Sequence, residues 1–223
     1  MNLEFLWLTL LFALVDWYAV GKNLKTVEYI AKPGVMLALL AWLWRLDGVH
    51  GQMVWFALGL LFSLAGDVFL MLPKERFIAG LAAFLLAHLA YIVGLNPTPP
   101  PISLPSLILL VMVVFTTAQV YRRLVAGITA RKLEGLQRPI LFYSIVISLM
   151  LLSALATLVR PEWKAFPSLW MSLGALLFFI SDATLAWNKF VVPLPYARLR
   201  VIIAYHLGQI AIILGAALHY LSP

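Results

Sequence analysis

Apolar residues fall into eight runs along the chain, and polar residues, Gly or Pro separate one run from the next. Each run is roughly 18–22 residues long, which is the length of a helix that spans the hydrocarbon core of a bilayer. The predicted spans are Leu3–Val20, Val27–Leu46, Met53–Leu72, Phe77–Leu95, Leu104–Tyr121, Ile140–Val159, Ser168–Trp187 and Val201–Leu221. The pattern predicts an all-α, polytopic membrane protein with eight transmembrane helices in one integral-membrane domain, residues 1–223.

Composition agrees with this prediction and excludes an ordinary soluble protein. Hydrophobic residues make up 64% of the chain and charged residues only 11%. The longest predicted connection, about Arg122–Arg138, is too short for a soluble domain. The chain has no Cys, which excludes disulfides, thiol catalysis and Cys-ligated metal, and its four dispersed His residues do not suggest a metal site. We therefore expect no metal and no cofactor.

Basic residues are sorted between alternate connections. Thirteen of the sixteen Lys and Arg residues lie in one set: Lys22, Lys25, Lys32, Lys74, Arg76, Arg122, Arg123, Arg131, Lys132, Arg138, Lys189, Arg198 and Arg200. The positive-inside rule places this set in the cytoplasm and both termini on the non-cytoplasmic side. The sorting explains the net charge of +7 without a nucleic-acid partner. In a bacterium the membrane would be the inner membrane, and the first span, which lacks a basic n-region and a cleavage site, is expected to be retained.

Two aspartates lie inside apolar spans. Asp67 follows Gly66 late in the third span, and Asp182 follows Ser181 late in the seventh. An intramembrane carboxylate costs roughly 3 kcal/mol or more, so it tends to face the bundle interior and to mark function. We predict that Asp67 and Asp182 form a catalytic pair, although either one alone would also suit a buried hydrogen bond between helices.

Other polar residues are expected near the two aspartates, because the predicted topology gathers them in the cytoplasmic half of the bilayer. The candidates for binding or orienting a substrate are Asp16, Lys32, Tyr205 and Gln209, with His88 and Tyr91 on one stripe of the fourth span. Each has an alternative. Asp16 would reach interfacial water, Lys32 would extend to the anionic leaflet, and His88 would be a satisfied bundle histidine.

The chain also shows signs of a four-helix repeat, with halves 1–98 and 99–223. Lys32-Pro33 is expected to open the second helix and Arg138-Pro139 the sixth. Gly66-Asp67 corresponds to Ser181-Asp182, and His88 to His206, at similar offsets along the chain. The alternative is a coincidence among the few polar residues of apolar helices.

Paired carboxylates in a low-dielectric site give an acid and a base from one residue type, because both do not ionise easily together. Such a pair suits the cleavage of an acetal-like or vinyl-ether bond through an oxocarbenium-like state. It would also suit an intramembrane aspartyl protease. The sequence Leu64-Ala-Gly-Asp67 lacks the first Gly of the Gly-x-Gly-Asp signature of those proteases, which weakens that alternative.

An ordered set of motifs resembles the YhhN-type lysoplasmalogenase family. The motifs are Lys32-Pro33, Phe62–Leu72 with Gly66-Asp67, Phe77–Tyr91 with His88, Tyr143, Phe179–Ala186 with Ser181-Asp182, and Tyr205-His-Leu-Gly-Gln209. Each motif is weak alone, but together they cover the second to the eighth span in order. The first span carries little of the resemblance, which leaves a role for Asp16 open.

The resemblance implies eight transmembrane helices and an alkenyl-ether hydrolase that cleaves a lysophospholipid, a lysoplasmalogen, to a fatty aldehyde and a glycerophospho-base. Through the Gly-Asp and Ser-Asp motifs it implies Asp67 and Asp182 as the catalytic pair. His88, Tyr91, Tyr143, Tyr205 and Gln209 would orient aspartates and substrate. A transporter or lipid-binding protein without hydrolytic activity is the alternative from another class, and the sequence indicates neither the head group nor an oligomeric state.

Overall fold

The structure is a computed structural model and describes residues 4–46, 49–72 and 76–221. Leu3, where the first span was expected to begin, and the basic residue Lys74 lie outside the described residues. The helices are α1 (Glu4–Gly21), α2 (Lys25–Arg45), α3 (Met53–Met71), α4 (Phe77–Leu95), α5 (Leu104–Ala130), α6 (Gln137–Ala156), α7 (Ala165–Phe190) and α8 (Ala197–Tyr220). Each is long and apolar enough to cross a membrane, which confirms the prediction of eight spans.

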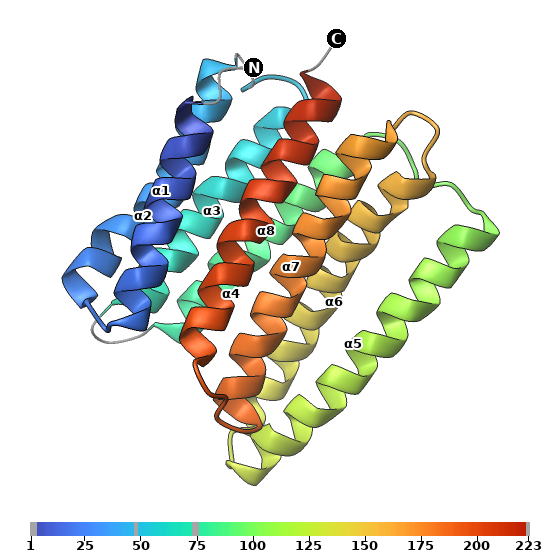
Figure 1. The fold of residues 1–223 in the computed structure, drawn as a ribbon. Helices are drawn as coiled ribbons and strands as arrows, with labels where there is room; N and C mark the ends of the chain where they lie inside the picture. The colour runs from blue at the N-terminus through green and yellow to red at the C-terminus, as the bar shows by residue number, and fades with distance from the viewer. Residues whose placement is uncertain (1–3, 47–48, 73–75, 222–223) are drawn as a thin grey trace.

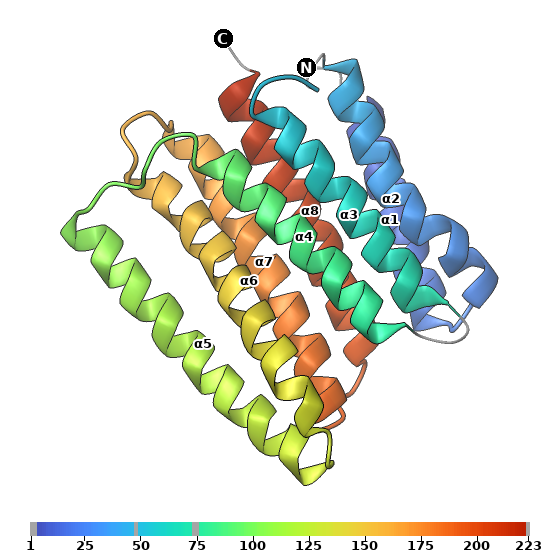
Figure 2. The same ribbon diagram turned by 180° about the vertical axis from the view of Figure 1, so that it is seen from behind.

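The helices run up and down in one bundle, with α1 and α2 at one edge and α5 at the opposite edge (Figures 1 and 2). Helix α8 lies inside the bundle, where it contacts α1, α2, α3 and α7, and it is the most buried span. Helix α5 packs mainly against α6 and α7, and most of its surface faces outward. The interior helix α8 therefore joins the two parts of the bundle, and α5 forms its outer wall.

Basic residues gather at one end of the bundle. Helix α1 begins and α8 ends at the other end, so the α1–α2, α3–α4, α5–α6 and α7–α8 connections share this basic end (Figure 1). Asp67 lies four residues before the last residue of α3, and Asp182 lies eight before the last residue of α7. At about 1.5 Å per residue, the two aspartates lie about 6 and 12 Å from the ends of their helices.

Two expectations about helix bounds were wrong. The segment 122–138, expected as the longest connection, is largely helical because α5 continues to Ala130. Leu124 and Ile128, one turn apart, are buried there in a cluster with Phe190, and this burial extends the helix beyond the apolar run. Pro33 does not open the second helix, because α2 begins at Lys25 and carries Pro33 inside it.

Helices α7 and α8 approach each other closely at two glycines. A Cβ atom on Gly174 would lie 2.5 Å from the backbone nitrogen of Ile212 and 2.8 Å from the carbonyl oxygen of Gly208. These are backbone atoms, so they cannot turn away as a flexible side chain does. Small residues allow this kind of contact between membrane helices. The contact fixes α7, which carries Asp182, against α8, which carries Tyr205.

Gly174→Ala should therefore destabilise the protein, because the added methyl group forces the two backbones apart. We expect a loss of about 1–3 kcal/mol in the free energy of unfolding, as for other overpacked sites. Thermal unfolding in detergent measures the change. Gly21→Ala is the matched control, because a Cβ on Gly21 meets nothing within 4 Å. Equal unfolding temperatures for the two variants would contradict the prediction.

Candidate active site

Asp67 lies where α2, α3 and α8 meet. Its Oδ1 atom is 3.0 Å from Nζ of Lys32, and the hydroxyl of Tyr205 donates a hydrogen bond of 2.8 Å to its Oδ2. Asp67 and Tyr205 are buried, and only 12% of the Lys32 side chain is exposed. Removing an ionised carboxylate from water is costly unless a partner charge and hydrogen bonds offset the loss. Lys32 and Tyr205 supply both, so the three side chains form one unit, the Asp67 cluster.

Asp182 lies in a second cluster, between α4, α6 and α7. The hydroxyl of Tyr143 donates a hydrogen bond to Oδ2 of Asp182. Nε2 of His88 is 3.0 Å from the Tyr143 hydroxyl and 3.3 Å from the same Asp182 oxygen. His88 is fully buried, whereas 14% of the Asp182 side chain is exposed. In the Asp182 cluster, the carboxylate therefore has an open side as well as two partners that can hold or move a proton.

An aromatic pair lies between the two clusters. The rings of Phe84 and Phe178 are in edge contact, with centroids 6.1 Å apart, and both pack against Tyr205 of the Asp67 cluster. Phe178 also contacts His88 of the Asp182 cluster, at 4.7 Å between ring centroids. The two aspartates thus belong to adjacent clusters that share an aromatic wall.

Tyr91 and Gln209 lie in a third set of buried contacts. The Tyr91 hydroxyl donates a 2.6 Å hydrogen bond to Oε1 of Gln209, and Nε2 of Gln209 donates one of 2.8 Å to the Ser63 hydroxyl. Gln209 follows Tyr205 by one turn of α8, and Ser63 precedes Asp67 by one turn of α3. These bonds therefore hold α8 in the register that points Tyr205 at Asp67.

Asp16 is buried in α1, and neither of its carboxylate oxygens has a hydrogen-bond partner among the described residues. This burial excludes the expected alternative, in which Asp16 reaches interfacial water. The adjacent Trp17 donates a hydrogen bond of 3.2 Å to Nδ1 of His206, on α8. Asp16 lies near the Asp67 cluster in the fold but makes no hydrogen bond with its described side chains, so its role stays a prediction.

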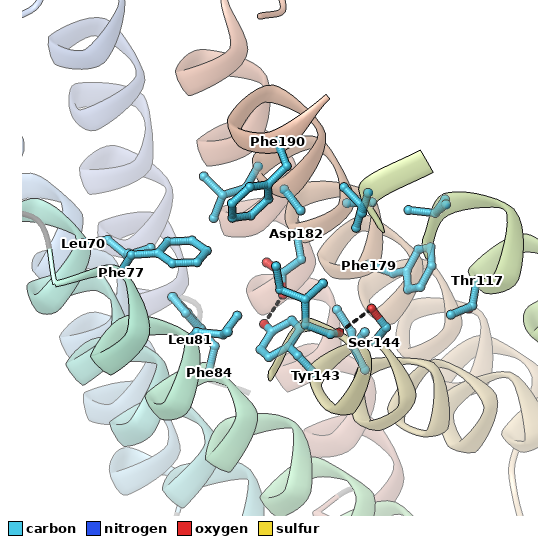
Figure 3. A pocket seen from close by; sticks show the side chains of 17 residues that line it. Leu70, Phe77, Leu81, Phe84, Thr117, Tyr143, Ser144, Phe179, Asp182 and Phe190 are labelled. Carbon is cyan, nitrogen blue, oxygen red and sulfur yellow. Dashed lines mark hydrogen bonds between the residues drawn. The ribbon is translucent and has the colours of Figure 1, made fainter. Parts of the chain in front are cut away.

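An apolar pocket opens beside Asp182, with a volume of about 710 Å³. Its lining comes from α3 to α7 and comprises Leu70, Phe77, Leu81, Phe84, Thr117, Val120, Leu124, Ile140, Tyr143, Ser144, Ile147, Phe179, Asp182, Ala183, Leu185, Ala186 and Phe190. Figure 3 shows the Asp182 carboxylate and the Tyr143 hydroxyl facing each other at this pocket. The pocket thus offers a carboxylate and a phenol to an otherwise apolar guest.

A groove of about 730 Å³ lies between α5 and α6, outside this pocket. Its lining is mostly aliphatic, with Tyr121 and three hydroxyl residues among the rest, and it shares Thr117 and Ser144 with the apolar pocket. The hydroxyls of Thr117 and Ser148 are 2.6 Å apart across the two helices. The groove therefore adjoins the apolar pocket on the side of the most exposed helix.

The structure gathers most of the residues that the sequence singled out. Lys32 and Tyr205 contact Asp67, His88 and Tyr143 contact Asp182, and Tyr91 bonds to Gln209. Sequence reasoning had not proposed a role for Ser63, Phe84 or Phe178. Each lies one helical turn before a site residue, Asp67, His88 and Asp182 respectively, and this spacing was the available signal.

Both clusters contain groups that can transfer protons. The groups that touch the carboxylates are an ammonium group, two phenols and an imidazole. Among residues 4–46, 49–72 and 76–221, no group of three or more His, Asp or Glu side chains is placed to hold a metal ion. The geometry thus suits acid–base chemistry on a molecule in the apolar pocket.

The YhhN family matches residues 27–216, which include both clusters and the apolar pocket. This chain belongs to the YhhN family. It is similar to lysoplasmalogenase TMEM86B of Sus scrofa, with 34% identity over 184 residues, 82% of this chain and 72% of that protein. TMEM86B of Mus musculus is 32% identical over 85% of this chain and 75% of its own length.

A bacterial relative extends the family likeness. The lysoplasmalogenase of Mycobacterium bovis is 31% identical over 140 residues, 62% of this YhhN chain and 51% of that protein. No solved structure matches the chain. The family match and the eight apolar helices together make the protein an integral membrane protein.

The ion pair in the Asp67 cluster predicts a strong energetic coupling between Lys32 and Asp67. Lys32→Met leaves a buried carboxylate without its cation, so we expect a loss of about 3–5 kcal/mol in stability. Adding Asp67→Asn should recover most of that loss, because no unpaired charge then remains. A double-mutant cycle of unfolding in detergent measures the coupling. Simple addition of the two single effects would show that the ion pair does not contribute to the fold.

Proposed function

We propose that this protein is a lysoplasmalogenase, which hydrolyses the vinyl-ether bond of a lysoplasmalogen to a fatty aldehyde and a glycerophospho-base. The observation that carries the proposal is the partly exposed carboxylate of Asp182, held by Tyr143 and His88 at an apolar pocket. The names of the YhhN relatives support the substrate class. Apart from Asp182, Tyr143, Thr117 and Ser144, the side chains that line the pocket are apolar, which suits an aliphatic chain.

In the proposed reaction, Asp182 acts as the acid. Its carboxyl group protonates the outer carbon of the vinyl ether, and the carbon next to the ether oxygen becomes an oxocarbenium centre. Water adds to that centre and loses a proton, and the resulting hemiacetal splits into aldehyde and alcohol. Tyr143 and His88 orient Asp182 and restore its proton for the next turnover, because both lie within hydrogen-bond reach of its Oδ2 atom.

Asp67 is proposed as the base that receives the proton from water. It lies one side-chain layer behind the pocket wall, since Phe84 lines the pocket and its ring packs against Tyr205, which is bonded to Asp67. The Tyr205 hydroxyl is the group through which the proton would reach the carboxylate. Lys32 is the salt-bridge partner of Asp67 and offsets part of the cost of the negative charge that the carboxylate carries when it acts as a base.

The substrate is proposed to enter from the bilayer. The mostly aliphatic groove between α5 and α6 adjoins the pocket through Thr117 and Ser144, so a lipid chain would reach Asp182 without crossing water. The polar head group then lies toward the basic end of the bundle. By the positive-inside rule this end faces the cytoplasm, with both termini outside, and in a bacterium the membrane is the inner membrane.

Asp182→Asn should abolish most of the activity, because an amide cannot donate the proton. We expect kcat for aldehyde release to fall by about 10²–10⁴-fold, and a comparable loss for Asp67→Asn. The assay is aldehyde release from a 1-O-alkenyl lysophosphatidylethanolamine by the folded, purified protein. Glu134→Gln, which neutralises an exposed carboxylate at the basic end, is the matched control. Near-native turnover by both asparagine variants would refute the assignment.

Isotope labelling tests which bond breaks. Hydrolysis in deuterated water should place one deuterium on the carbon next to the aldehyde carbon. The aldehyde is reduced at once to its alcohol, because an aldehyde would otherwise exchange further hydrogens at that carbon. In ¹⁸O-labelled water the glycerophospho-base should stay unlabelled, because its ether oxygen comes from the substrate. Mass spectrometry of both products reads the labels. Label in the glycerophospho-base would indicate a different bond cleavage and contradict the proposed mechanism.

A further inference from the structure

A second cavity, of about 950 Å³, opens at the basic end of the bundle. Its polar lining consists of Lys25, Glu28 and Lys32 from α2, Asn188 and Lys189 from α7, and Arg198 from α8; the other lining residues are apolar. We call this cavity the basic pocket. It contains four cationic side chains and one acidic side chain, so its lining favours an anion.

The basic side chains are held in place by contacts within the protein. Nη2 of Arg198 donates hydrogen bonds of 2.7 and 2.8 Å to the two carboxylate oxygens of Glu28. Nζ of Lys25 lies 3.2 Å from Oε2 of the same residue. Asn188 accepts a hydrogen bond of 2.8 Å from the backbone of Leu194, which orders the α7–α8 connection. Glu28 thus positions two of the four cations at the wall of the basic pocket.

The basic pocket adjoins the apolar pocket. Leu70 and Leu185 line both cavities. Lys189, which lines the basic pocket, places its ammonium group 4.5 Å from the ring centroid of Phe77, which lines the apolar pocket. Lys32 lines the basic pocket and binds Asp67. A molecule with an anionic head and an aliphatic tail can therefore occupy both cavities at once.

We propose that the basic pocket binds the phosphate of the lysophospholipid head group. The inference rests on the proposed function and deepens it, because it names the part of the substrate that the enzyme recognises. Only a glycerol backbone separates the phosphate from the vinyl ether. A phosphate near Lys32, Lys189 and Arg198 would hold the scissile bond at the boundary of the two pockets, close to both aspartate clusters.

This site gives the enzyme a physical basis for selecting its substrate. Charge-assisted hydrogen bonds from Lys and Arg to phosphate are stronger than bonds between neutral groups. An alkenyl glycerol without phosphate would fill the apolar pocket but would make no such bonds in the basic pocket. It would therefore bind more weakly, although Asp182 would meet the same vinyl ether.

The test compares two substrates in mixed micelles: 1-O-alkenyl glycerophosphoethanolamine and the matching phosphate-free 1-O-alkenylglycerol. Lys189→Gln and Arg198→Gln should each raise KM for the phosphate substrate by about tenfold, which corresponds to about 1.4 kcal/mol, with kcat little changed. KM for the phosphate-free substrate should stay the same. Arg200→Gln is the control, because Arg200 is an exposed cation two residues from Arg198 that does not line the pocket.

Two variants on different helices guard against a folding defect: Arg198→Gln on α8, which removes a partner of Glu28, and Lys189→Gln on α7. The inference is overturned if both variants leave KM for the phosphate substrate unchanged, if they raise KM for both substrates equally, or if Arg200→Gln acts as strongly. If the native protein releases no aldehyde from either substrate, the proposed function itself fails. The two failures are therefore distinguishable.

Inhibition by soluble anions shows whether the basic pocket recognises the phosphate alone or the whole head group. Glycerophosphoethanolamine and inorganic phosphate are each added to the native protein and to Lys189→Gln. Competitive inhibition of the native protein by both assigns the site to phosphate, and inhibition by glycerophosphoethanolamine alone assigns it to the head group. Inhibition should be about tenfold weaker in the variant. Inhibition by neither anion, or equal inhibition of both proteins, would overturn the inference.

Discussion

A buried carboxylate in an apolar helix bundle needs a partner, and this requirement organises the molecule. Asp67 on α3 takes its partners from α2 and α8, and Asp182 on α7 takes its partners from α6 and α4. Each aspartate therefore ties its own helix to one helix from the other half of the chain. Without these contacts an isolated charge would remain in a low-dielectric interior, so the alternative packings of the same eight helices are strongly disfavoured.

The sequence allowed the fold class to be predicted because apolar runs of membrane-spanning length leave few alternatives. It also pointed to side chains that the structure brings together in two clusters, since Asp67, Asp182, Lys32 and His88 are rare residue types for such spans. Two features were beyond it. The extension of α5 depends on the burial of Leu124 and Ile128 against another helix, and that contact is not visible in local hydropathy.

The arrangement of the site was the other feature that the sequence did not reveal. Helical phase put polar residues on common faces, but it gave no information on which helices are neighbours. As a result, we expected the aspartates to form one pair. The sequence did not indicate that Phe84 and Phe178 form an aromatic wall between their clusters. Nor could periodicity distinguish Tyr91 and Gln209, which set the register of α8, from Tyr143, which lies at the pocket.

The exposed position of α5 has a consequence for the environment of the enzyme. Thr117, Val120 and Leu124 of this helix line the apolar pocket, yet α5 is the least buried of the eight spans. The helix that forms one wall of the pocket therefore has its outer side toward the surrounding lipid. The acyl composition and lateral pressure of the host membrane therefore act directly on the shape of this pocket, as the solvent shell acts on the surface of a soluble enzyme.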